Sequence, residues 1–222
     1  LRIGTSAVAY DEATAENVSQ KMGAAMFAFM ERAKQELLIT NAYIIPGEPG
    51  IDLVRRLTER GVKVKILTNS LASHDVPAVN SHYKDWRDDL VDAGAELYEL
   101  RADAQIKSIV DVPPAQGEFV GLHTKAAVAD RQHLFIGSMN LDPRSVNINT
   151  EAGVFIDSPR RAEDVAARME RDREAEYAWQ VLLDENGEVY WINSDETVTV
   201  QPARSGTQRV MDVIFKAFPK EY

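Results

Sequence analysis

Short apolar segments alternate with amphipathic segments in the first half of the chain. Residues 36–45, 62–67 and 96–100 are rich in apolar and β-branched side chains, which predicts strands. Residues 49–61 and 76–93 carry apolar side chains at spacings of three and four, which predicts helices. Because a chain that alternates strands with helices makes crossover connections, this order predicts parallel strands covered by helices.

The remaining segments extend this pattern into one predicted domain over residues 1–222. The predicted fold class is α/β, with a mixed, largely parallel sheet flanked by helices. The further predicted elements are a helix at 18–33, a strand at 119–129, a turn at 130–132, strands at 133–137 and 151–157, a long charged helix at 159–180 and a strand at 189–192.

Polar residues between positions 123 and 151 have a spacing that chance does not explain. The pattern H-x-K-x4-D-x6-G-S-x-N is formed by His123, Lys125, Asp130, Gly137, Ser138 and Asn140, and Glu151 follows eleven residues later. If each fixed position is matched about one time in twenty, six positions recur at roughly one in 10^8 starting points. The pattern therefore indicates a shared function.

The predicted strands bring these side chains together. Side chains alternate between the two faces of a strand, so His123 and Lys125 are expected on one face of the strand at 119–129. Ser138 and Asn140 share a face by the same rule, and Gly137 permits the close approach of a substrate. An imidazole, an ammonium, a hydroxyl and a carboxamide are thus predicted to converge.

This combination of groups suits a phosphodiester, which needs a nucleophile and donors for its anionic oxygens. Phosphoryl transfer depends mainly on positioning and on stabilisation of charge. A histidine with an unperturbed pKa of about 6.5 is partly neutral at pH 7 and can act as the nucleophile. A carboxylate such as Glu151 could hold its other ring nitrogen.

The motif resembles the signature of the phospholipase D superfamily. This resemblance implies an α/β/α sandwich and a phosphohistidine formed without metal or cofactor. It implies that His123 is the nucleophile or its paired acid, and that Glu151 orients a catalytic imidazole. The residues implied to hold the phosphate oxygens are Lys125, Ser138 and Asn140.

Asp130 completes the catalytic motif of that superfamily. Its place in the turn at 130–132 favours a structural role through hydrogen bonds to nearby backbone. The sequence thus predicts a catalytic set of His123, Lys125, Asp130 and Glu151 in which Asp130 acts on the turn.

Further segments resemble the carboxy-terminal half of bacterial cardiolipin synthases of the C type. They are residues 41–48, 67–73, 75–79, 96–100 and 140–145. The resemblance implies a phosphatidyltransferase acting on phosphatidylglycerol-like or phosphatidylethanolamine-like lipids. A hydrolytic phosphodiesterase, either a phospholipase D or a nuclease active as a homodimer, is the alternative. An assembly or membrane-docking module without catalysis is a third reading.

Enzymes of the superfamily build one active site from two copies of the motif, whereas this chain has one copy. The second copy is expected from an amino-terminal half of the same protein, or else from a second chain in a homodimer. A start at Leu1 instead of methionine favours a processed or partial chain. The isolated chain is accordingly predicted to be inactive or weakly active.

Charge and composition limit the class of partner. With 25 Lys and Arg against 35 Asp and Glu, the net charge is -10, which argues against a general affinity for nucleic acid. The chain has no cysteine, so disulfides and thiolate metal sites are excluded. No apolar run approaches the roughly 20 residues of a membrane-spanning helix.

Residues 201–222 form a predicted amphipathic tail. The apolar stripe of this tail contains Val210, Val213, Ile214, Ala217 and Phe218, with basic residues beside it. Such a stripe either docks on the core or lies in a bilayer interface next to anionic lipid. The second alternative predicts a peripheral protein on the cytoplasmic side of the membrane.

Three residues after the predicted strand at 62–67 are placed to line a site. Asn69, Ser70 and His74 follow the end of that strand, where α/β proteins gather ligand-binding residues. His82, on a predicted helix, and His133, after the turn, are predicted to be structural or surface residues.

Overall fold

A computed structural model describes residues 6–8, 19–104 and 119–215. The described strands form one ten-stranded sheet in the order β1-β7-β6-β5-β2-β3-β4-β8-β9-β10. The strands are β1 (Ser6–Val8), β2 (Glu36–Asn41), β3 (Lys63–Asn69), β4 (Glu96–Leu100), β5 (Lys125–Ala129), β6 (His133–Gly137), β7 (Gly153–Asp157), β8 (Ala178–Leu183), β9 (Val189–Ile192) and β10 (Thr197–Val198). The helices are α1 (Ser19–Glu31), α2 (Gly47–Glu59), α3 (Pro77–Tyr83), α4 (Arg87–Asp92), α6 (Pro143–Asn147), α7 (Pro159–Arg171) and α8 (Gly206–Phe215).

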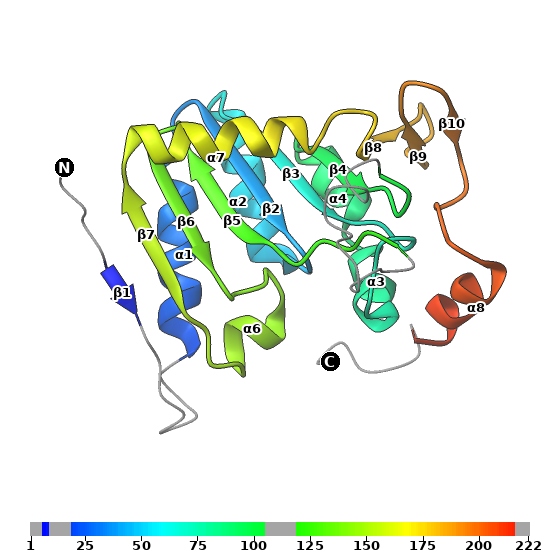
Figure 1. Ribbon diagram of the computed structural model, residues 1–222, viewed down its shortest axis with the longest axis horizontal. Coiled ribbons are helices and arrows are strands. Elements are labelled where there is room, and N and C mark those ends of the chain that lie inside the picture. The colour runs from blue at the N-terminus through cyan, green and yellow to red at the C-terminus, as the bar shows by residue number, and fades with distance from the viewer. Residues whose placement is uncertain (1–5, 9–18, 105–118, 216–222) are drawn as a thin grey trace, which may run out of the picture.

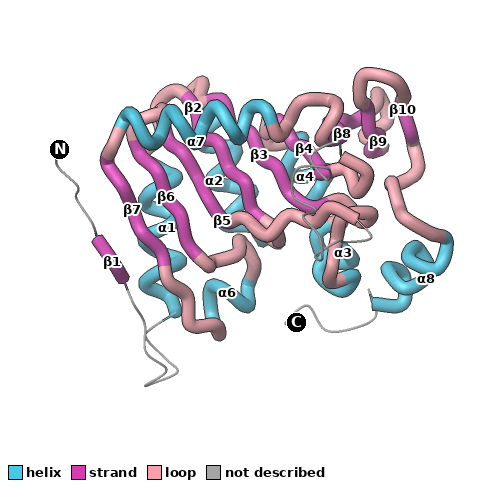
Figure 2. The backbone as a smooth tube through the Cα atoms, in the orientation of Figure 1, coloured by secondary structure: helices cyan, strands magenta, loops and turns pink. Residues whose placement is uncertain are grey.

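Helices cover both faces of the sheet. Figure 1 shows α7 crossing one face, while α1, α2 and α4 lie on the other. The smooth trace in Figure 2 shows the same layers, with α8 beyond the far end of the sheet. The predicted α/β class and the flanking helices are therefore confirmed.

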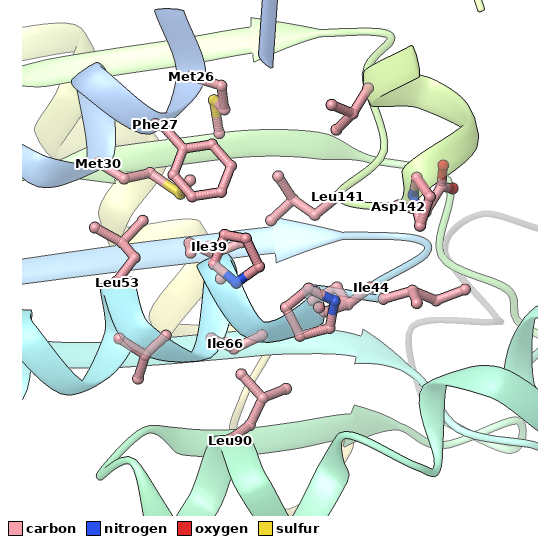
Figure 3. Close-up of a pocket in the computed structure, with 18 of the residues that line it drawn as sticks. Met26, Phe27, Met30, Ile39, Ile44, Leu53, Ile66, Leu90, Leu141 and Asp142 are labelled. Atoms are coloured by element: carbon pink, nitrogen blue, oxygen red, sulfur yellow. The ribbon is translucent and has the colours of Figure 1, made fainter. Parts of the chain in front are cut away.

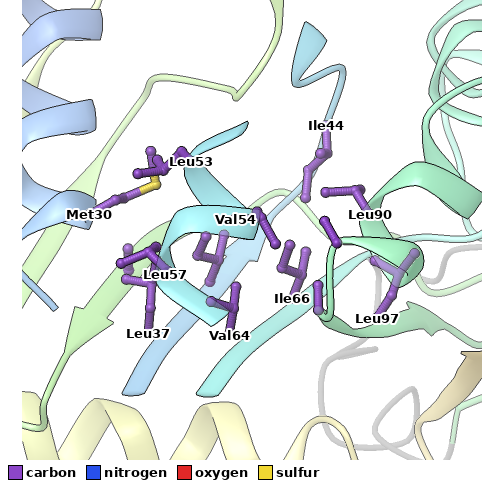
Figure 4. Packing of buried hydrophobic residues seen from close by; sticks show 14 of the residues in the cluster. Met30, Leu37, Ile44, Leu53, Val54, Leu57, Val64, Ile66, Leu90 and Leu97 are labelled. Atoms are coloured by element: carbon purple, nitrogen blue, oxygen red, sulfur yellow. The ribbon is translucent and has the colours of Figure 1, made fainter. Parts of the chain in front are cut away.

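The central strands are buried on both faces. Leu37 and Ile39 of β2 pack in the large core under α1 and α2, and Leu38 between them packs under α7. Figure 4 shows Leu57 of α2 close to Val64 and Ile66 of β3 in the large core. Burial on both faces explains why these strands are continuous apolar runs in the sequence.

The prediction that the sheet is largely parallel is wrong. Among the described strands, only the pairs β2–β3 and β3–β4 are parallel. The turn after β5 reverses the chain with positive φ at Asp130 (54°) and Arg131 (53°), which is the geometry of a tight hairpin. This hairpin makes β5 and β6 antiparallel. β5 to β7 extend one side of the sheet by antiparallel pairs, and β8 to β10 extend the other side in the same way.

The predicted helix at 76–93 is two helices, α3 and α4. Between them, the N–H groups of Asp85 and Trp86 donate to carbonyls only three residues back, those of His82 and Tyr83. Such tight turns interrupt the α-helical ladder and redirect the chain. The helical spacing of apolar residues continues across this break. The sequence pattern therefore does not indicate that the helix is interrupted.

The predicted helix at 159–180 ends earlier, because α7 stops at Arg171 and β8 begins at Ala178. Charged residues continue beyond the end of α7 to position 176, without a glycine or proline. The sequence therefore carries no signal that ends the helix at Arg171. Pairing of β8 with β4, through contacts such as Leu97 opposite Val181, decides the strand conformation. This strand and the short β1 and β10 were missed.

Candidate active site

Figure 1 shows the edge of the sheet where β2 and β3 end, and the motif residues other than Asp130 lie there. Asn41, the last residue of β2, pairs with Lys125, the first residue of β5. Because β5 and β6 are antiparallel, the end of β6 returns to this edge, and Ser138 follows it directly. The Ser138 N–H donates to the Ala152 carbonyl at 2.8 Å, which fixes the start of the next segment.

His123 lies just before β5 and not inside a strand, so the prediction that alternation along a strand places it was wrong. The buried Asn69 holds the chain here: its Oδ1 accepts from Leu122 N at 2.8 Å and its Nδ2 donates to Leu122 O at 2.9 Å. The His123 side chain is exposed, and its ring makes no hydrogen bond among the described residues. The imidazole is thus free to meet a substrate.

Lys125 is a buried cation beside His123. It is 7 % exposed, and its Nζ donates to the His123 carbonyl at 2.9 Å. Burial lowers the pKa of Lys125. The negative charges of Glu151, Asp75 and Asp142 oppose this shift. A charge in so dry a position interacts more strongly with a phosphate oxygen than it would in water.

Ser138 and Glu151 form a tight pair. Ser138 Oγ donates to Glu151 Oε2 at 2.5 Å, and Asn149 Nδ2 donates to Glu151 Oε1 at 3.2 Å. These contacts fix a carboxylate that is only 6 % exposed. Among the described residues, no hydrogen bond joins Glu151 to His123, so the predicted contact of this carboxylate with an imidazole is not made within the chain.

Asn140 presents a polar group that the described protein does not satisfy. Its Oδ1 is buried and has no hydrogen-bond partner among the described residues. Rotation of a carboxamide by 180° exchanges oxygen and nitrogen, so this position can also offer an N–H donor. An unsatisfied buried amide is costly, and a ligand oxygen would remove that cost.

Tyr43 and His74 form one wall of the site, and sequence reasoning missed Tyr43. Their rings stack with centroids 5.2 Å apart, and Lys125 Nζ lies 5.6 Å from the Tyr43 ring centroid. Tyr43 Oη donates to Asp75 at 2.8 Å. Tyr43 lies two residues after the end of β2, which was the available signal.

His74 is a neutral packing residue at physiological pH. It is 1 % exposed, and burial lowers its pKa to about 4, although Asp75 and Asp212 oppose this shift. Its Nδ1 accepts a hydrogen bond from Val76 N at 3.3 Å. His74 therefore supports Tyr43 from behind and carries no charge.

Asp130 fastens the motif hairpin to the rest of the fold. Its carboxylate accepts from the backbone N–H groups of Lys34 (3.0 Å), Gln35 (2.7 Å) and Glu36 (3.1 Å). These residues lead into β2, so Asp130 holds β5 and β2 in register at the end opposite to Lys125. Its carboxylate is occupied by backbone and does not reach the other motif side chains.

Two wider searches concern the described residues only. Within them there is no group of three or more His, Cys, Asp or Glu side chains that could hold a metal ion. In the same part of the chain, no helix is long and apolar enough to cross a membrane.

Solved structures share this fold. Nuc of Salmonella typhimurium, a phospholipase D family member, aligns with a TM-score of 0.57 at 17% identity, over 79% of this chain and 97% of Nuc. NucT from Helicobacter pylori aligns with a TM-score of 0.58 at 13% identity, over 77% and 95%. At these identities the likeness concerns the fold. This chain therefore shares its α/β fold with both structures.

The chain belongs to the family described as "Cardiolipin synthase, PLD-like domain", whose model matches residues 26–173. Among curated relatives, Cardiolipin synthase C of Escherichia coli K12 is 34% identical over 202 residues, which are 89% of this chain and 42% of that protein. Cardiolipin synthase B of the same strain is 30% identical over 127 residues, 57% of this chain and 26% of that protein. The chain thus spans less than half the length of these relatives.

Proposed function

We propose that this chain is a catalytic half of a phosphatidyltransferase of the cardiolipin synthase type. The observation that carries the proposal is the free imidazole of His123 beside a buried cation, Lys125, and an unsatisfied amide, Asn140. These groups suit a phosphodiester anion. Identity of 34% to Cardiolipin synthase C over 89% of the chain supports a lipid substrate.

In the proposed first step, a ring nitrogen of His123 attacks the phosphorus of a phospholipid. The P–O bond to the head-group alcohol breaks, and a second imidazole gives the departing oxygen its proton. Lys125 and Asn140 stabilise the non-bridging oxygens. In the second step, the second imidazole takes the proton of an acceptor alcohol, whose oxygen attacks phosphorus and releases His123. Water as acceptor would make the same site a hydrolase.

The second imidazole has to come from outside this chain. All four histidines of the sequence lie in the described part. His74 and His82 are buried at 1 % and 2 % exposure, and His133 is bound to Arg32 and Asp157. We therefore propose that a second motif, from an amino-terminal half or from a second copy, supplies it. Glu151 is the carboxylate to which that imidazole would bind.

The proposed substrate surface is a membrane, and α8 supports this. The helix faces the protein with its polar side: Asp212 accepts from Asn80 Nδ2 at 2.7 Å and pairs with Lys84 Nζ at 2.6 Å, and Gln208 donates to the Leu71 carbonyl. The exposed side chains of α8 are largely apolar and include Val210 (59%), Met211 (38%), Val213 (68%) and Ile214 (49%). An apolar face turned to solvent is typical of helices that lie in a bilayer interface.

Charge placed on this face should release the chain from vesicles. We expect the double substitution Val213→Glu and Ile214→Glu to reduce binding to phosphatidylglycerol vesicles by at least about tenfold, because two apolar contacts are lost and anionic lipid repels the new charge. Sedimentation with vesicles measures this. The double substitution Val213→Leu and Ile214→Leu, which keeps both exposed positions apolar, is the matched control and should change binding little. Equal binding by the double variant would contradict the membrane role.

Product analysis tests the proposed reaction. With the full-length protein and phosphatidylglycerol or phosphatidylethanolamine vesicles, mass spectrometry should detect cardiolipin as the product. The 222-residue chain alone should give little or none, because one imidazole is missing. Phosphatidic acid as the sole product of the full-length protein would replace the transferase with a hydrolase.

A further inference from the structure

An apolar cavity of about 300 Å³ lies between the sheet and the helices α1, α2 and α6. Figure 3 shows Met26 and Met30 of α1 facing Leu53 of α2 across it, with Ile39 of β2 between them. All but two of the residues around it are apolar or glycine, and the exceptions are Asp142 and Asn147. The volume is roughly twice that of an engineered apolar cavity of about 150 Å³ that stays dry and binds benzene.

The cavity has a closed end and an open rim. Its deep walls, such as Leu57, Ile66 and Leu90, are almost completely buried. The lining residues that are partly or fully exposed lie around the start of α2, on α6, and at Phe27 and Leu141. The polar groups of the rim are already bonded: Asp142 accepts from Ser145 N, and Asn147 donates to the Pro143 carbonyl. An occupant therefore enters between α1, α2 and α6 without meeting a free polar group of these two residues.

One backbone ladder separates this cavity from the catalytic site. Leu141 N donates to the Tyr43 carbonyl at 3.1 Å, and Ile45 N donates to the Leu141 carbonyl at 2.7 Å. Leu141 and Ile44 line the cavity, whereas their chain neighbours Asn140 and Tyr43 belong to the catalytic site. Consecutive Cα atoms are about 3.8 Å apart, so the cavity begins within one residue of the phosphate-binding groups.

We propose that this cavity binds one acyl chain of the phospholipid whose phosphate lies against Lys125 and Asn140. The inference rests on the proposed function and adds the place where the enzyme holds its lipid. The glycerol backbone of the lipid then crosses the rim beside Leu141, with the phosphate on one side of the ladder and the hydrocarbon on the other.

Hydrocarbon fits the walls better than a peptide segment does. A peptide would bring backbone N–H and C=O groups into a lining that offers them almost no partners, and buried backbone groups without partners are costly. An unbranched acyl chain has no such groups along its length. Three methionines, Met26, Met30 and Met139, are flexible enough to follow its shape.

Chain-length dependence of binding tests the proposal on the 222-residue chain. The probes are monomeric dioctanoyl and dibutyryl phosphatidylglycerol, measured by calorimetric titration. Each buried methylene contributes about fourfold in affinity. An octanoyl chain has four more methylenes than a butyryl chain, and burial of two of them in the cavity should make the dioctanoyl lipid bind more than about tenfold tighter. Val54→Phe, which fills the cavity from α2, should abolish this preference. Val200→Phe, at an exposed position outside the cavity, should keep it.

A photoreactive lipid keeps the test independent of whether the variant folds. A phosphatidylglycerol with a diazirine in its acyl chain should crosslink the unmutated protein within α1 or α2. Crosslinks confined to α8, or equal affinities for the two lipids, would overturn the proposal, as would a folded Val54→Phe variant with unchanged preference. Binding requires no turnover. Chain-length preference in the 222-residue chain, together with no cardiolipin synthesis when the second motif is also present, would therefore refute the proposed function and leave the acyl site standing. Cardiolipin synthesis without the chain-length preference would support the proposed function and refute the acyl site.

Discussion

Replacement of His123 by alanine should lower the proposed cardiolipin formation, measured with the second motif present, at least ~10^3-fold. Whether His123 attacks phosphorus or protonates the departing oxygen, no other described imidazole can take its place, and general acid–base groups alone contribute about 10^2 to 10^4-fold. We propose His123 as the reacting histidine because its ring is exposed and makes no hydrogen bond within the described residues, and because Lys125 Nζ donates to its carbonyl. Initial rates measured by mass spectrometry give the ratio.

His133→Ala is the matched control for that experiment. His133 belongs to β6 and is bound to Asp157 and Arg32 on the surface, at the opposite end of β6 from Ser138. Its loss should leave the rate within about twofold, because surface pairs contribute little to stability. Equal loss of activity in both variants would mean that His123 supports the fold and does not react.

Removal of Glu99 should cause the largest loss of stability of any single change outside the catalytic site. Glu99 is completely buried, and its carboxylate accepts from Tyr83 Oη at 3.0 Å, Arg87 Nε at 2.6 Å and Trp191 Nε1 at 2.9 Å. The Arg87 guanidinium lies between the Tyr83 and Trp191 rings, 4.9 and 5.0 Å from their centroids. This cluster joins α3, α4, β4 and β9.

Glu99→Ala leaves Arg87 as a buried charge without a carboxylate. Breaking a buried pair in this way costs about 3–5 kcal/mol, which lowers Tm by roughly 6–20 °C in a domain of this size. Calorimetric unfolding measures the shift. Glu96→Ala, on the same strand, removes a partly exposed carboxylate 3.8 Å from Lys65 and should lower Tm by only a few degrees.

A double variant separates the two possible causes of such a loss. Adding Arg87→Met to Glu99→Ala removes the stranded charge, so most of the lost stability should return. If the double variant is less stable than Glu99→Ala, the packing of Arg87 against the Tyr83 and Trp191 rings stabilises the fold by more than its unpaired charge destabilises it.

The candidate site was predictable where residues close in sequence make it. The motif hairpin holds Lys125, Asp130 and Ser138 within fourteen residues, and two strands with a tight turn return Ser138 to the edge at which Lys125 starts. Tyr43 stayed hidden because it reaches Lys125 from another segment, after the end of β2. His74, which stacks on Tyr43, was predicted near the site from its place after the strand at 62–67. His123 was predicted as a site residue for a geometric reason that fails, since Asn69 positions its segment and no strand does.

The sequence by itself determined the α/β class, the motif hairpin and the core elements α1, β2, α2, β3 and β4, because period and turn chemistry act over a few residues. It also determined the family, through fixed polar positions. Only the tertiary structure decided the rest. Whether residues 178–183 form helix or strand depends on a free edge of β4, and whether α8 docks by its polar or its apolar side depends on the partners Asn80 and Lys84. Contacts between residues about 80 to 130 positions apart determine both conformations. A local sequence pattern cannot indicate such contacts.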